Sequence, residues 1–179
     1  MKRMSVSGAM LLAATVAQAQ GSVRFANRVP GLLDAPVIVK YGETLYPAHS
    51  MFVAQLYASP VGGTLAAIGA PIPFRDAPEA GYWPDEIRTI PGVAPGGTAQ
   101  VKVVSWVYGL GATYEYAVSQ NLARVGESDV FMVTTGGGSV PPAPMLGLTS
   151  FTVVVPFVPE PSPAALGLFG ALTLLAWRR

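Results

Sequence analysis

The chain has 179 residues, enough for one domain with its targeting segments, and it contains no cysteine. The lack of cysteine excludes a disulfide framework, a Cys-His catalytic pair and a lipid anchor on cysteine. The formal net charge of +1 is unevenly spread, because residues 20–160 hold seven basic and ten acidic residues, a net charge of −3. Such a mildly acidic body argues against a nucleic-acid partner, which would need a basic surface.

The N-terminus has the features of a secretory signal peptide. Lys2 and Arg3 precede an apolar run over residues 6–17, and Ala17 and Ala19 supply the small side chains that signal peptidase needs. We predict a signal peptide over residues 1–19 that is cleaved before Gln20. An uncleaved N-terminal anchor helix is the alternative.

Residues 20–157 form the predicted body of the protein. Short runs of alternating apolar residues are separated there by glycine and proline, a pattern typical of β-strands. The expected strands cover residues 22–27, 36–41, 51–58, 64–68, 86–90, 99–108, 113–119, 129–135 and 149–157. This spacing predicts an all-β fold, a two-sheet sandwich that is immunoglobulin-like or jelly-roll-like.

The strand over residues 99–108 is the clearest of these. One of its faces carries Val101 and Val103, and the other carries Val104 and Trp106. Because both faces are largely apolar, we expect a central strand that is covered on both sides and contributes much of the stability.

Two segments of the body break the alternation. Residues 70–81 contain three prolines and several charges, and we expect them to form a long surface loop. Residues 136–144 are rich in glycine and proline and are expected to form a flexible connection. The body shows no helical pattern.

Few residues could support catalysis. His49 is the only histidine, so a Ser-His-Asp triad would have to use it, and its place beside Ser50 before a strand favours a turn exposed to solvent. A zinc site would normally take more His and Cys ligands than the chain has. We therefore predict that the protein is not an enzyme and has no metal site or cofactor.

Paired carboxylates are the other catalytic possibility, since glycoside hydrolysis needs only two acids at a set separation. The sequence brings no two of them together, and exposed acids at strand ends are expected. The candidates are Asp85, Glu86, Glu115, Glu127 and Asp129.

Aromatic side chains could instead bind sugars. Same-face pairs are expected at Trp106 with Tyr108 and at Tyr114 with Tyr116, where packing on the sheet is the expected role. Tyr82 and Trp83 follow the proline-rich loop. We predict these two as the exposed glycan contact.

The last 22 residues, 158–179, have a three-part order. Pro159, Glu160 and Pro161 open the segment, an apolar run over residues 164–177 follows, and Arg178 and Arg179 end the chain. As a helix the run would be roughly 21 Å long, short for a hydrocarbon core of about 30 Å, and the arginines would hold its end on the cytoplasmic side. A single-pass tail anchor or a buried C-terminal helix is the alternative.

This order of Pro-Glu-Pro, apolar helix and terminal arginines resembles the PEP-CTERM sorting signal. The resemblance implies export in a Gram-negative bacterium that makes exopolysaccharide, an inner-membrane intermediate, processing near Pro159–Pro161 by an exosortase, and delivery to the cell surface or extracellular matrix. Signal peptidase would act at the other end. The implied role of the body is structural or adhesive in a biofilm. A carbohydrate-binding module is the alternative, and a surface glycoside hydrolase the third.

Overall fold

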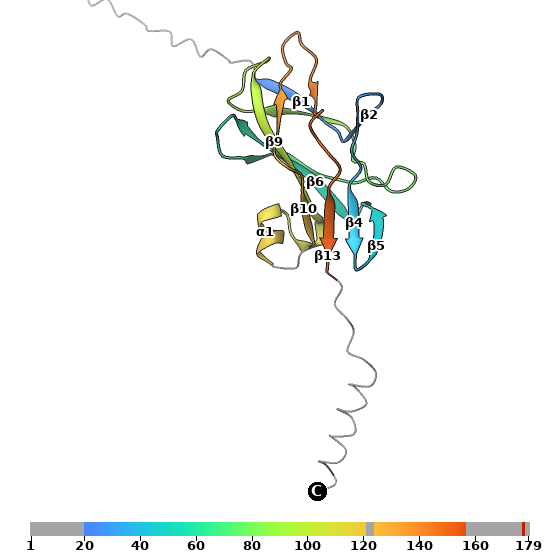
Figure 1. The fold of residues 1–179 in the computed structure, drawn as a ribbon. Coiled ribbons are helices and arrows are strands. Elements are labelled where there is room, and N and C mark those ends of the chain that lie inside the picture. The colour runs from blue at the N-terminus through green and yellow to red at the C-terminus, as the bar shows by residue number, and fades with distance from the viewer. Residues whose placement is uncertain (1–19, 121–123, 157–176, 178–179) are drawn as a thin grey trace, which may run out of the picture.

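A computed structural model of the protein describes residues 20–120, 124–156 and 177. The body is built of strands joined by turns, so the prediction of an all-β fold is confirmed (Figure 1). The strands are β1 (Gly21–Phe25), β2 (Arg28–Val29), β3 (Leu33–Asp34), β4 (Ile38–Tyr41), β5 (Thr44–Pro47), β6 (Phe52–Pro60), β7 (Ala66–Pro73), β8 (Glu86–Ile90), β9 (Thr98–Val107), β10 (Val125–Glu127), β11 (Phe131–Thr134), β12 (Ala143–Pro144) and β13 (Thr152–Val155). The helical elements are the 3-10 helix η1 (Tyr108–Leu110) and the α-helix α1 (Tyr114–Ser119).

The larger sheet has the strand order β5-β4-β13-β10-β9-β6-β7. β9 lies inside it, because β6 pairs along one edge while β10 and then β11 pair along the other. Between β10 and β11 the side chain of Ser128 replaces a backbone acceptor, since Val103 N donates a hydrogen bond to Ser128 Oγ at 3.0 Å. The prediction of a central strand at residues 99–108 is therefore confirmed.

The smaller sheet has the order β12-β1-β8. β8 is antiparallel to β1, with Arg24 opposite Ile87, and β12 is parallel to β1. β2 and β3 form a separate two-stranded hairpin directly after β1. The hairpin turns at Gly31, whose φ of 77° is readily adopted by glycine.

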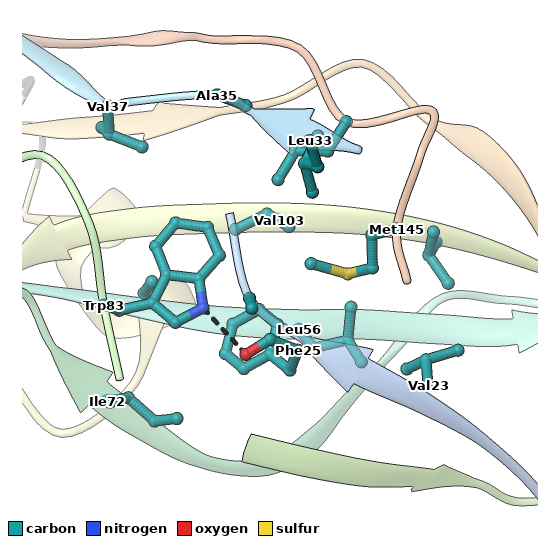
Figure 2. Packing of buried hydrophobic residues seen from close by; sticks show 14 of the residues in the cluster. Val23, Phe25, Leu33, Ala35, Val37, Leu56, Ile72, Trp83, Val103 and Met145 are labelled. Atoms are coloured by element: carbon teal, nitrogen blue, oxygen red, sulfur yellow. Dashed lines mark hydrogen bonds between the residues drawn. The ribbon is translucent and has the colours of Figure 1, made fainter. Parts of the chain in front are cut away.

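A main hydrophobic cluster contains residues of both sheets. Val23 and Phe25 come from β1, whereas Leu56 and Val103 come from β6 and β9, and all four are 0% exposed. Figure 2 shows these side chains together with the indole of Trp83.

A second cluster covers the opposite face of β9. Val104 and Trp106 pack there with Val53 and with Ala117 of α1. Both faces of β9 are thus buried, as the alternation of apolar residues along this strand predicted.

The strand expected over residues 113–119 is wrong, because α1 forms there. The hydroxyl of Thr113 accepts a hydrogen bond from Tyr116 N at 3.3 Å and so caps the first turn. Tyr114 and Ala117 lie three residues apart and both contact the sheet through the second cluster. Tyr114 and Tyr116 therefore do not form a same-face strand pair.

The two expected loops are partly strand. β7 extends to Pro73 inside the range 70–81, where prolines are tolerated because β7 is an edge strand. Within the range 136–144, Gly136 pairs with Ser22 and β12 pairs with β1. The expected surface loop at residues 70–81 therefore begins as a strand, and the expected flexible connection at residues 136–144 pairs with β1.

β7 also contacts the smaller sheet through Arg88 of β8. Arg88 Nη2 donates to Ala70 O at 2.8 Å, and its guanidinium lies 5.7 Å from the ring centre of Phe25. Gly69 has a φ of +69°, and a Cβ at this position would lie 1.5 Å from Arg88 Nη1. The positive φ favours glycine here, and any larger residue would force the Arg88 guanidinium to move.

Candidate functional site

The predicted processing sites lie mostly outside the described residues. This holds for Ala17 and Ala19 and for the sorting motif of Pro159, Glu160, Pro161, Arg178 and Arg179. Gln20 is described and is exposed immediately before β1. Of the expected apolar helix only Trp177 is described, and it is 87% exposed.

In the described part of the chain, no helix has the length and apolar character needed to cross a membrane.

Two cavities, of about 500 and 380 Å³, adjoin on the surface, since both are lined by Arg24 and Asp85. The first lies beside Ile87 and two prolines, and the second extends along Arg28, Arg75 and Tyr82. We call this surface, defined by Arg24, Arg28, Arg75, Tyr82 and Asp85, the arginine groove.

Strand alternation positions the first part of the groove. Val23 and Phe25 of β1 are buried in the core, so Arg24 between them faces outward. Ile87, its register partner on β8, is 63% exposed on the same face. Arg24 Nε donates to Asp85 Oδ2 at 2.5 Å, which links β1 to the segment that precedes β8.

Arg28 and Tyr82 form the second part. The guanidinium carbon of Arg28 lies 5.0 Å from the ring centre of Tyr82, a cation–π contact. The hydroxyl of Tyr82 donates to Asp34 Oδ1 at 2.7 Å, and this hydrogen bond raises the pKa of Tyr82. A second ion pair, Arg75 with Glu79, completes the wall.

Asn27 holds the segment that carries Tyr82. Its side chain is 0% exposed, and its Nδ2 donates to Ala35 O at 2.9 Å and to Gly81 O at 2.8 Å. Its Oδ1 accepts a hydrogen bond from Trp83 N at 3.2 Å. The chain is thus fastened on both sides of Tyr82.

The prediction that Trp83 is an exposed contact is wrong. Trp83 is 3% exposed, its ring lies 5.0 Å from Phe25 and 5.5 Å from Phe74, and its Nε1 donates to Phe25 O at 3.2 Å (Figure 2). Its large ring fills the core and its one polar atom has a partner there. Tyr82, by contrast, lies at the wall of the groove.

Four of the five candidate acids are engaged with other side chains, and the fifth, Asp129, is exposed. Asp85 pairs with Arg24, and Glu86 pairs with Arg88. The hydroxyl of Tyr57 donates to Glu115 and lowers the pKa of that carboxyl.

Glu127 accepts hydrogen bonds from Lys102 at 2.8 Å and from Tyr114 at 3.1 Å. The bond from Lys102 lowers the pKa of Glu127. A glycosidase general acid needs the opposite shift, a raised pKa. Burial of the Tyr114 hydroxyl, and to a smaller extent the negative charge of Glu127, raise the pKa of Tyr114 to about 12.

Asp76 lies near both His49 and Ser50, but no hydrogen bond joins the His49 ring to a serine or an acid among the described residues. The His49 ring packs 5.5 Å from Phe52 and 6.1 Å from Tyr46. Asp76 instead accepts a hydrogen bond from the backbone NH of Ser50 at 3.1 Å, which lowers the pKa of Asp76. Within residues 20–120 and 124–156, no three His, Asp or Glu side chains gather as metal ligands would.

Sequence reasoning did not single out Arg24, Arg28, Arg75 or Asn27. One signal was present for Arg24, a charged residue between two apolar neighbours of a strand, which marks an outward position.

Comparison of the chain with known protein families, with curated proteins and with solved structures finds no match in any of the three.

Proposed function

We propose that this chain is an exported protein with a structural or adhesive role at the cell surface or in the extracellular matrix of a Gram-negative bacterium. The order of the C-terminal segment carries the proposal, with Pro159-Glu160-Pro161 first, the apolar run next and Arg178-Arg179 last. Signal peptidase would cut before Gln20. The apolar run would then anchor the chain transiently in the inner membrane, and an exosortase would cleave near the prolines.

The extent of the strands supports this division. β1 begins at Gly21, directly after the predicted cleavage position, and β13 ends at Val155, before Pro159. Processing at both positions would remove none of the strands described here. The start of β1 and the end of β13 lie at opposite ends of the body (Figure 1).

The body is proposed to be a two-sheet sandwich. The shared core supports this, because β1 of the smaller sheet and β9 of the larger sheet bury Phe25 and Val103 in one cluster. Because the chain has no cysteine, its hydrophobic core must stabilise the fold without disulfides. A domain with such a core suits a structural role outside the cell.

The second candidate function is carbohydrate binding at the arginine groove. It is favoured by a specific observation, the open surface that combines the Tyr82 ring with the ion pairs of Arg24 and Arg75. Hydrolysis of a glycan, the third possibility, is disfavoured because Asp85, Glu86, Glu115 and Glu127 are each held by another side chain.

Mass spectrometry of the protein recovered from the cell surface tests the export proposal. The expected mature chain begins at Gln20 and lacks the residues after the proline cluster. Replacing both Arg178 and Arg179 by Asp is expected to cause mis-sorting. Arg124→Asp, a charge reversal at one exposed position of the body, is not. An intact full-length chain working in the cytosol would refute the proposal.

A further inference from the structure

Arg28 differs from the other two arginines of the groove because it forms no ion pair with a described residue. The neighbouring arginines are paired, Arg24 with Asp85 and Arg75 with Glu79. Among the described residues no carboxylate lies within ion-pair distance of Arg28, which stacks on Tyr82 instead. Stacking uses the face of the guanidinium plane and leaves the N–H groups at its edge for another acceptor.

The nearest candidate partner has another role. Asp34 is the register partner of Arg28 across the β2-β3 hairpin, but its carboxylate accepts the hydrogen bond of the Tyr82 hydroxyl. Three arginines and two carboxylates line the second cavity, a net charge of +1 in a body of net negative charge. Asp34 keeps its negative charge beside this cavity, so what Arg28 lacks is an acceptor for its N–H groups rather than a compensating charge. A carboxylate suits the planar fork of Arg28.

The rest of the groove suits a ligand rich in hydroxyl groups. Each of the two ion pairs presents donors and acceptors side by side, and a hydroxyl both donates and accepts. Ile87, Pro141 and Pro142 add apolar surface in the first cavity, where the C–H face of a sugar ring can pack. The two cavities share Arg24 and Asp85, so a ligand longer than one sugar ring could contact both.

The backbone around the groove disfavours a peptide ligand. Extended peptides commonly bind by adding a strand to a free sheet edge. β1 is paired on both sides, and the β12 edge beside it carries Pro144, which has no N–H to donate. β8 is the other edge strand, and Arg88 on it donates to Ala70 O of β7. The side chains of the groove are therefore the groups available for recognition on the face of β1.

We infer that the arginine groove binds a polysaccharide bearing carboxylate groups, a polymer of uronic acids, with Arg28 taking the carboxylate and the two ion pairs taking hydroxyls. The inference rests on the carbohydrate-binding candidate above and is independent of how the protein is sorted. β1 and β2, which carry Arg24 and Arg28, lie toward the end of the body opposite the exit of β13 (Figure 1).

Calorimetric titration of the full-length chain in detergent tests the inference, with polygalacturonate, dextran and polyglutamate as probes at equal ionic strength. Polygalacturonate is expected to bind at least tenfold more tightly than the other two. Arg28→Gln should weaken that binding about ten- to a hundredfold, because one charge-assisted contact is lost. Arg124→Gln, the same change at an exposed arginine outside both cavities, should leave it unchanged.

Several results would overturn the inference. Equal binding of polyglutamate, or equal weakening by Arg28→Gln and Arg124→Gln, would mean unspecific attraction of anions. Equal binding of dextran would overturn the carboxylate assignment while supporting a neutral glycan site. No binding to any probe would remove the site without affecting the mass-spectrometric test of export.

If Arg28→Gln lowers the melting temperature, Arg28→Lys replaces it as the test. Lysine keeps the charge but lacks the planar fork, so binding should weaken several-fold. Unchanged binding by a folded Arg28→Lys variant would then overturn the role given to Arg28.

Discussion

Replacement of Asn27 by Asp tests the arrangement that holds the groove together. The change is nearly isosteric, but it removes the amide that donates to Ala35 O at 2.9 Å and Gly81 O at 2.8 Å. Gly81 O keeps its hydrogen bond from Val37 N at 3.0 Å, so Ala35 O is the carbonyl left unsatisfied, at about 1–3 kcal/mol. A buried carboxylate facing both carbonyl oxygens adds several kcal/mol more. The expected loss is about 4–8 kcal/mol, comparable to the whole stability of many domains.

Urea unfolding followed by tryptophan fluorescence measures this loss, since Trp83 packs beside Asn27 and reports on the core. The buried carboxylate should have a raised pKa, so the loss relative to wild type should be larger at pH 8 than at pH 5, where the group takes up a proton. Gln120→Glu is the control, because it makes the same amide-to-acid change at an exposed position. A loss below about 1 kcal/mol for Asn27→Asp would refute the reasoning.

Three further perturbations test the core, a glycine and the acid side of the stability curve. Val103→Asp should prevent stable folding because it buries an unpaired carboxylate in β9, and an unchanged melting temperature would contradict the role of this strand. Gly69→Ala should cost about 1–3 kcal/mol in urea unfolding and more than Gly62→Ala, which shares the positive φ but meets nothing within 4 Å; equal losses would contradict the contact argument. The hydrogen bond from the Tyr57 hydroxyl lowers the pKa of Glu115 below 4.5 in the folded protein. This bond therefore stabilises the fold above that pH, and the stabilisation disappears as the pH falls through the folded-state pKa. Melting temperatures from pH 3 to 7 should therefore fall less steeply at the acid end for Glu115→Gln, and parallel curves would contradict the shift.

Strand positions were predictable where the alternation was strong. β8 lies at Glu86–Ile90, as expected, and β9 at Thr98–Val107 has the two buried faces that its apolar residues indicated. The period of two belongs to the extended backbone itself, so it can be read without knowledge of the partners.

The segment over residues 113–119 shows where local pattern was insufficient. Its tyrosines and valine favour a strand, yet six of its residues form α1 because Ala117 and Tyr114 can pack on Trp106. A segment of this length has weak preference of its own, and burial against the sheet decides its conformation. Trp83 is a similar case, since only the packed core decides that its ring is inside.

By itself the sequence determined the all-β class, the outward and inward positions of the strong strands, and the two terminal segments with their charges, because these depend on residues close together in the chain. The tertiary structure alone decided the arginine groove. Arg24, Arg75 and Asp85 come from separate segments, and their ion pairs leave the guanidinium of Arg28 on Tyr82 without a carboxylate among the described residues. Pairing of charges depends on distances of a few ångströms between segments far apart in sequence, which local pattern does not contain.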